Sequence, residues 1–426
     1  MAALNIEGGR KLSGRLQVEG NKNAALPLIA ACLLTSDECV LTNVPRIRDV
    51  ATMCRLLTGL GASVEGVDTP TLRIRCANVT SDAPDARLVG MLRGSVLLLG
   101  PLVARCGRAR LAQPGGDFPA RRTISTHLAA LMAMGAQILD DSGNAIDAAD
   151  GLRGARIYLD EASVTGTETA VLAAVRAEGQ TRLRNAACEP HVVELCRFLR
   201  AMGADITGEG TPTITINGSV PLHGATHQLD GDYIEAGSWG VVAAVTGGCI
   251  EVTGARADDM EVIAAPLVHM GVRCTIDEGL FRIEPSKLTA VRRLTTGLWP
   301  GFPSDLVSLV TVLATQAEGK TLVHDWMYEL RLFALEQLSA MRADLFLCDP
   351  HRIIVTGPTK LRGRALDSRD IRSGMALIAA ALSADGHSRL APLETVERGY
   401  ARVVERLQAL GAQVEIADAR RPENGL

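Results

Sequence analysis

Two kinds of helical pattern recur along the whole chain. In the first kind nearly every position is apolar, as in LPLIAACLL (26–34), LVSLVTVLATQA (306–317) and GMALIAAALSA (374–384). In the second kind only one side is apolar, as in VVELCRFLRAMGA (192–204). A helix that is apolar all round is typical of a buried position, and an amphipathic one of a position that covers a core. Alternating residues around a Gly/Pro turn, as in ADITGEGTPTITING (204–218), predict hairpins between these helices.

A repeat of about 70 residues organises these elements. Its marker is a Gly that follows an amphipathic helix, in GLGASVE, AMGAQIL, AMGADIT and ALGAQVE, with two weaker copies in HMGVRCT and AMRADLF. The markers stand at Gly61, Gly135, Gly203, Gly271, Arg342 and Gly411. Each repeat is predicted to consist of helix–strand–helix–strand–strand, and a single repeat cannot bury its own helices. We therefore expect two lobes of three units, with the apolar helices inside, the sheets outside and a substrate cleft between the lobes. A passive solenoid of six units is the alternative.

Composition narrows the function classes. The chain has 426 residues, of which 47% are hydrophobic and 22% charged, which excludes a disordered or fibrous protein. A net charge of −4 and 3% aromatic residues argue against nucleic-acid partners and a membrane-surface role. The apolar runs are too short for a membrane span, and no signal pattern opens the chain, so we expect a soluble, cytoplasmic protein. The ten cysteines form no CxxC, and Cys188, His191 and Cys196 alone do not make a zinc site, so no metal is predicted.

Cations before apolar helices are the main candidate chemistry. Lys22 and Asn23 open one such helix, and Arg93 and Arg372 hold similar places in their repeats. A cation beside the free N–H groups of a helix start suits an anion. The repeat places several cations equivalently, which favours one convergent anion site.

Two further segments carry candidate polar residues. LAQPGGDFPARRTIS has the Gly/Pro content of a lid and holds Asp117, Arg121 and Arg122. FPSDLVSLV places Asp305 in the first turn of a helix, with Ser304 as its expected cap and Asp305 as a possible base. Arg331 in YELRLF and Arg398 in VERGYARV complete the set of candidate cations.

These segments together resemble one family. GNKNAALPL, LRGSVLLLGPLVAR, PGG, RNAACEP, GFPSDL, ELRLF, DIRSGMALIAA and ERGYARV are similar to segments of the UDP-N-acetylglucosamine 1-carboxyvinyltransferases, enolpyruvyl transferases that open peptidoglycan synthesis. The sister family acting on shikimate 3-phosphate looks less similar. The resemblance implies the inverted α/β barrel, with two lobes of three βαβαββ-type repeats. It places one lobe with the Asp117 loop at 22–229 and the other at 1–21 plus 230–426, with the active site between them.

The resemblance also implies the reaction and the residues that serve it. The enolpyruvyl group of phosphoenolpyruvate moves to a sugar 3-hydroxyl and phosphate leaves, with no metal or organic cofactor. Phosphoenolpyruvate carries about three negative charges, which guanidinium groups and a lysine can hold. The residues implied for it are Lys22, Arg122 and Arg398 at the phosphate end, Arg331 and Arg372 at the carboxylate, and in addition Asn23. Lys22 and Arg398 are also implied as catalytic residues, with Asp117 and Asp305. Asp305 would accept the hydroxyl proton. The residues implied for the acceptor are Asn23, Arg93, Ser125, Ser163, Val164, Glu189 and Asp305.

Several positions depart from the family pattern. Asp117 stands where the family usually has a cysteine that protonates the methylene carbon, and we expect it to serve as the acid but to resist covalent trapping by the epoxide antibiotic fosfomycin. On the acceptor side, the departures are Ser125, Glu161, Thr165 and His191. They leave two alternatives open: enolpyruvyl transfer to another nucleotide or sugar phosphate such as UMP, and a catalytically silent scaffold. The sequence makes no prediction about the oligomeric state.

Overall fold

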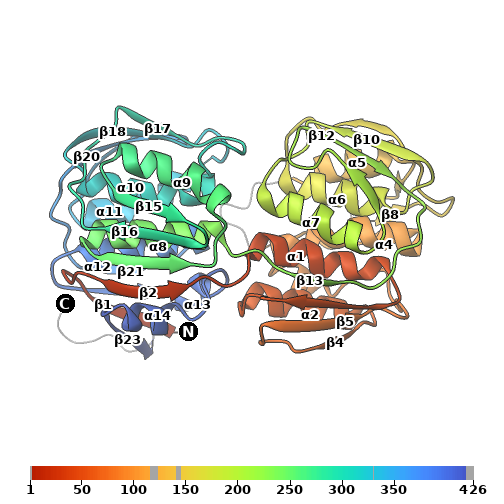
Figure 1. The fold of residues 1–426 in the computed structure, drawn as a ribbon, viewed down its shortest axis with the longest axis horizontal. Helices are drawn as coiled ribbons and strands as arrows, with labels where there is room; N and C mark the ends of the chain where they lie inside the picture. Colours follow the sequence, from red (N-terminus) through yellow and green to blue (C-terminus); the bar gives the residue numbers. More distant parts are fainter. Residues whose placement is uncertain (1, 116–122, 141–144, 330, 419–426) are drawn as a thin grey trace. The chain divides into compact units, whose positions relative to one another are not determined.

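The chain divides into two compact units. The computed structural model describes residues 2–115, 123–140, 145–329 and 331–418 (Figure 1). Unit 1 consists of residues 1–19 and 231–426, and unit 2 of residues 20–230. The chain therefore passes between the units at Glu19–Gly20 and again at Asp230–Gly231. No described helix is both long enough and apolar enough to cross a membrane.

Unit 1 contains three four-stranded sheets with one common topology. Their orders are β21-β22-β1-β23, β15-β16-β14-β2 and β17-β18-β20-β19. In each sheet one strand pair is parallel (β21/β22, β2/β14, β17/β18) and the other two pairs are antiparallel. The strands are β1 Ala2–Glu7, β2 Ser13–Gln17, β14 Cys249–Thr253, β15 Arg273–Asp277, β16 Leu280–Glu284, β17 Arg293–Thr295, β18 Gly319–His324, β19 Asp344–Asp349, β20 Arg352–Gly357, β21 Ala365–Asp367, β22 His387–Ala391 and β23 Gln413–Asp418.

Unit 2 contains the other three sheets. Two of them, β11-β12-β10-β9 and β13-β3-β5-β4, repeat the topology of unit 1, and within the described residues the third, β6-β8-β7, has three antiparallel strands. The strands are β3 Glu38–Thr42, β4 Ser63–Glu65, β5 Thr71–Arg75, β6 Arg108–Arg110, β7 Gln137–Ile138, β8 Ala145–Asp147, β9 Arg156–Tyr158, β10 Gln180–Arg184, β11 Asp205–Thr207, β12 Thr213–Asn217 and β13 Thr226–Gln228.

Apolar helices fill the centre of each unit, as their sequences predicted. In unit 1 these are α8 Tyr233–Thr246, α10 Val307–Gln316 and α12 Ile371–Ser383, which pack on one another. Every residue of α8 is buried. In unit 2 the corresponding helices are α1 Lys22–Ala31, α4 Leu99–Cys106 and α6 Val164–Ala174. Figure 1 shows the sheets lying around these helices in each unit.

The remaining helices cover or connect these layers. The longer ones bury only part of their residues: α2 Arg48–Gly59, α5 Ser125–Ala133, α7 Pro190–Ala201, α9 Ala257–His269 and α14 Val403–Ala409. The short ones are η1 Cys32–Leu34, α3 Ala86–Val89, η2 Arg93–Leu98, η3 Ser304–Leu306, η4 Arg331–Leu335, α11 Glu336–Ala340 and α13 Leu393–Val396.

The repeat marker corresponds to one backbone conformation in all six copies. The five glycines have positive φ between 84° and 105°, which is the left-handed conformation that ends a helix. Arg342, the marker of the weakest copy, has φ 76°. The copy with Arg342 in place of a glycine therefore has the same turn.

Candidate functional site

One carboxylate joins two predicted arginines in unit 1. Asp305 lies in η3 at the start of α10, and Arg331 lies at the start of η4. The Nη1 of Arg331 is 3.3 Å from Asp305 Oδ1, and the Nη2 and Nε of Arg372 are 2.9 Å and 3.1 Å from Asp305 Oδ2. Each oxygen of the carboxylate therefore meets a guanidinium group, and the Asp305 side chain still keeps 28% of its surface exposed.

Hydroxyl groups and a second carboxylate hold Arg331. Its Nη1 donates to the Ser304 hydroxyl at 2.7 Å, and Ser304 in turn donates to the buried Asp325 at 2.7 Å. Burial lowers the pKa of Arg331, but Asp305 and Asp325 oppose burial, and the net pKa lies above the usual value. The expectation that Ser304 caps the helix is wrong, because its hydroxyl is used by Asp325 and Pro303 holds the cap position.

The start of α12 presents Arg372 in the same cluster. Asp370 caps this helix by accepting from the N–H groups of Arg372 and Ser373 at 2.9 Å and 3.0 Å. Arg372 is 7% exposed, and its Nη1 donates to the Tyr400 hydroxyl at 3.2 Å. Arg398 is half-buried two residues before Tyr400. Unit 1 thus brings Asp305, Arg331 and Arg372 into direct contact.

In unit 2, Lys22 opens α1 as predicted and is paired with a carboxylate. The Asn21 side chain caps the helix by accepting from the backbone N–H groups of Asn23 and Ala24. The Lys22 Nζ lies 2.8 Å from Asp49 Oδ2, and the two side chains are 11% and 5% exposed. Asp49 comes from the first turn of α2 and was not a sequence candidate.

A chain of polar contacts connects predicted acceptor residues in unit 2. Arg93 opens η2 and donates from Nη2 to the Thr123 carbonyl at 2.8 Å, and the Thr123 and Ser125 hydroxyls are 2.9 Å apart. Two residues further along α5, His127 Nε2 lies 2.9 Å from the Thr165 hydroxyl. Burial, helped by the charge of Arg93, lowers the pKa of His127 to about 4, so the ring is neutral near pH 7.

The start of α6 completes the acceptor side. Ser163 caps this helix by accepting from the Gly166 N–H at 3.2 Å, and Val164 is its first residue. One turn in, Glu168 is 1% exposed, and its Oε1 has no hydrogen-bond partner among the described residues. Burial, and next the charge of Glu189, raise the pKa of Glu168 well above its usual value. Glu189 therefore lies near a carboxyl that favours its neutral form.

The other predictions have different outcomes. Asp117, Arg121 and Arg122 lie outside the described residues. His191 is buried and Glu161 is exposed. No local sequence signal marks Asp49, Asp325 or Tyr400 as part of these clusters, although Tyr400 stands within the ERGYARV segment. No group of three metal-binding side chains is placed to hold an ion in the part of the chain that the structure describes.

Comparison with known proteins defines the class to which this fold and these clusters belong. The family model for EPSP synthase (3-phosphoshikimate 1-carboxyvinyltransferase) matches residues 6–407. The chain belongs to this family of enolpyruvyl transferases, and within it to the UDP-N-acetylglucosamine 1-carboxyvinyltransferases, as the resemblance predicted. The relative of this name from Bradyrhizobium diazoefficiens is 44% identical over 98% of each chain. That from Treponema denticola is 40% identical over 97% of this chain and 99% of its own.

Solved structures confirm the predicted fold. The enolpyruvyl transferase NikO from Streptomyces tendae superposes with a TM-score of 0.87 at 26% identity, over 98% of this chain and 99% of that one. EPSP synthase from Acinetobacter baumannii gives a TM-score of 0.77 at 22% identity, over 98% and 100% of the two chains. At that identity the second likeness shows the fold alone.

Proposed function

We propose that the chain transfers the enolpyruvyl group of phosphoenolpyruvate to the 3-hydroxyl of UDP-N-acetylglucosamine and releases phosphate, the first committed step of peptidoglycan synthesis. The observation that carries the proposal is the convergence of Arg331 and Arg372 on Asp305. It occurs in a chain that is similar over nearly its whole length to enzymes of that name.

The arginine cluster suits the carboxylate of the donor. Two guanidinium groups within reach of one point can hold a carboxylate through paired, charge-assisted hydrogen bonds. Arg331 and Arg372 are fixed by Ser304 and Tyr400, so binding would order few side-chain torsions. We assign these two arginines to the carboxylate of phosphoenolpyruvate.

The same cluster gives Asp305 the properties of a base that the donor activates. With both oxygens held by guanidinium groups, Asp305 is stabilised as an anion and is a weak proton acceptor. A donor carboxylate at the arginines would compete for those contacts and would add a negative charge nearby. Both effects increase the proton affinity of Asp305, which could then accept the proton of the sugar hydroxyl as its oxygen attacks the donor.

Further assignments follow the family resemblance. Lys22, Arg122 and Arg398 would hold the phosphate that leaves, and Asn23 would contact the substrates. Asp117 would deliver a proton to the methylene carbon, which balances the proton that Asp305 removes from the hydroxyl. The resulting tetrahedral intermediate then returns a proton and expels phosphate, and no cofactor enters the scheme. We expect the protein to act in the cytoplasm.

Glu161 supports a second candidate, transfer to a nucleotide other than a UDP-sugar. The family usually has a lysine for the diphosphate at this position, and a carboxylate there would repel it. The Glu161 side chain is exposed, however, and a solvent-exposed charge contributes only about 1 kcal/mol or less. The penalty is too small to exclude a diphosphate, so UDP-N-acetylglucosamine remains the favoured acceptor.

Phosphate release with a panel of acceptors tests the proposal. The protein is incubated with phosphoenolpyruvate and either UDP-N-acetylglucosamine or UMP. Release that depends on UDP-N-acetylglucosamine is expected, release with UMP alone would favour the second candidate, and release with neither would favour a silent scaffold. Asp305→Ala should abolish release, while Asp344→Ala, which removes an exposed aspartate of unit 1, should leave it unchanged.

A further inference from the structure

The guanidinium group of Arg372 divides its nitrogens between two kinds of partner. Nε and Nη2 face the Asp305 carboxylate at 3.1 Å and 2.9 Å, whereas Nη1 donates to the Tyr400 hydroxyl at 3.2 Å. Tyr400 comes from the turn after α13, about 30 residues beyond Arg372. Its hydroxyl also lies 2.8 Å from the Ser238 hydroxyl in α8. Arg372 is thus joined through Tyr400 to the central helix of the unit.

The hydrogen bonds that join Arg372, Tyr400 and Ser238 can be assigned a direction, starting from the Ser238 hydroxyl. The Ser238 hydroxyl donates its only hydrogen to the Ile234 carbonyl at 2.7 Å, because a carbonyl can only accept. Ser238 must therefore accept the hydrogen of Tyr400. The lone pairs of the Tyr400 oxygen then face Arg372, which can only donate. Along this series of hydrogen bonds, Arg372 donates to Tyr400, Tyr400 donates to Ser238, and Ser238 donates to the Ile234 carbonyl.

Burial makes this arrangement rigid. Tyr400 and Ser238 are 0% exposed, and the Arg372 guanidinium carbon lies 5.4 Å from the centre of the Tyr400 ring. Burial raises the pKa of Tyr400 above its usual value, although Arg372 opposes the effect, so the phenol keeps its proton near pH 7. A buried hydrogen-bond chain that is fully satisfied favours a single conformation of its members.

We infer that Tyr400 is a positioning residue that holds Arg372 through its hydroxyl, so that Nε and Nη2 form a preset fork for a carboxylate. This inference rests on the proposed function, since it names what that fork binds: the carboxylate of the donor. A neutral hydroxyl fixes the third nitrogen without neutralising the guanidinium. The Tyr400 hydroxyl therefore adds no competing negative charge, and a donor carboxylate would share Nε and Nη2 with Asp305, which already contacts both.

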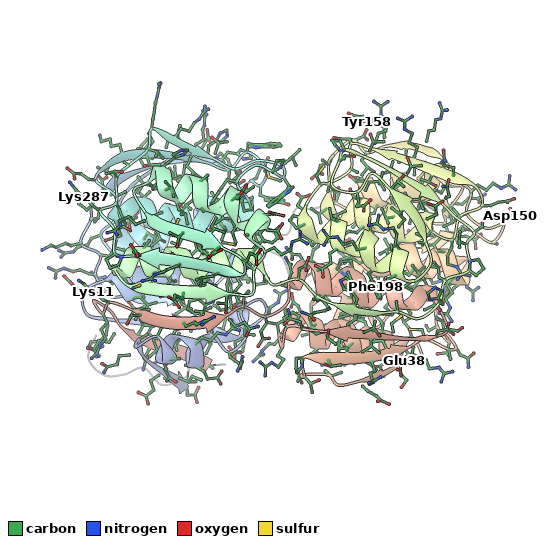
Figure 2. All side chains as sticks on the ribbon, in the orientation of Figure 1. Lys11, Glu38, Asp150, Tyr158, Phe198 and Lys287 are labelled. Carbon is green, nitrogen blue, oxygen red and sulfur yellow. The ribbon has the colours of Figure 1, made fainter. Side chains whose placement is uncertain are left out.

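The variant Tyr400→Phe isolates the hydroxyl, because it keeps the ring and its packing. Loss of one hydrogen bond to a charged group should raise the KM for phosphoenolpyruvate about tenfold to a hundredfold, with the KM for the acceptor unchanged. Ser238→Ala removes the acceptor of the Tyr400 proton, together with the hydrogen bond from Ser238 to the Ile234 carbonyl within α8, and should give a smaller rise in the same KM. Tyr158→Phe is the matched control, because Tyr158 is 66% exposed on β9 of unit 2 and is labelled in Figure 2.

Direct binding of phosphoenolpyruvate, followed by calorimetry, separates this inference from the proposed function. If the wild type neither binds the donor nor releases phosphate, the proposed function fails. If the wild type binds and Tyr400→Phe binds equally well, the positioning role is refuted. Equal rises in both KM values together with a lower unfolding temperature would also refute it, because they indicate a general structural role. Selective loss of donor binding at an unchanged unfolding temperature supports it.

Discussion

Removing one partner of the buried Lys22–Asp49 pair should destabilise unit 2 far more than removing both. Asp49→Asn leaves the Lys22 ammonium without its 2.8 Å partner in a site where that side chain is 11% exposed. Lys22→Met removes the cation instead, and Lys22→Met/Asp49→Asn replaces the pair by neutral groups of similar size. The three variants and the wild type form a double-mutant cycle.

The geometry sets the expected size of the effect. At 2.8 Å and an effective dielectric constant of about 20, the attraction is about 6 kcal/mol. Desolvation of two charges offsets most of this in the intact pair, but a single variant loses the attraction and keeps one desolvated charge. We therefore expect about 3 kcal/mol of destabilisation for Asp49→Asn, and a coupling energy of at least about 1 kcal/mol across the cycle.

Hydrogen exchange of the α1 and α2 amides measures the destabilisation caused by each variant, because it reports the opening free energy of the two helices that carry the pair. A matched control exists in the same unit: Arg73 and Glu38 are 3.0 Å apart, with side chains 53% and 48% exposed. The same cycle there, with Arg73→Met and Glu38→Gln, should give a coupling energy below about 1 kcal/mol. A buried pair no more strongly coupled than this exposed pair would refute the reasoning.

Four further predictions follow from single groups. Because the pKa of Glu168 is raised in the folded protein, its protonated form stabilises the fold at low pH, and this contribution to the free energy of unfolding is lost as the pH rises above about 4.5. In urea unfolding, Glu168→Gln should therefore become more stable than the wild type at higher pH. Glu161→Gln, on the surface, should show no such trend. His127, with a pKa of about 4, should show no ring titration by NMR between pH 8 and pH 5.5, and a midpoint near 6.5 would contradict its burial. Arg105→Met, which removes four hydrogen bonds to backbone carbonyls, should cost about 2 kcal/mol or more in thermal unfolding, and an unchanged Tm would be inconsistent. Asp117 should leave turnover insensitive to fosfomycin, and a stoichiometric covalent adduct by mass spectrometry would disprove this.

Much of the fold could be predicted because short-range sequence features define the repeat. Apolar helices, hairpin turns and a glycine at each helix end are short-range features, and repetition makes each copy support the others. Arg342 shows where such local features fail. An arginine does not predict a left-handed turn, yet Arg342 has a φ of 76°, because the surrounding repeat fixes the backbone there.

The partners of the candidate residues could not be predicted, because they come from distant parts of the chain. Asp49 follows Lys22 by 27 residues, and Tyr400 follows Arg372 by 28. Nothing in the local sequence shows which side chain a folded unit brings to a cation. Ser304 illustrates the same point: its position before a helix predicts a cap, but its hydroxyl binds the buried Asp325 instead.

The kind of partner determines what a buried cation can still bind. Lys22 has a carboxylate at 2.8 Å, so an incoming phosphate must share or displace that charge. Arg331 and Arg372 share Asp305 and each donates to a neutral hydroxyl, and the buried Asp325 adds a second negative charge near Arg331. A carboxylate at the place of Tyr400 would add a further negative charge beside Arg372 and would weaken the binding of another anion there. A neutral hydroxyl at this position therefore keeps the cluster an anion site even while Asp305 occupies it.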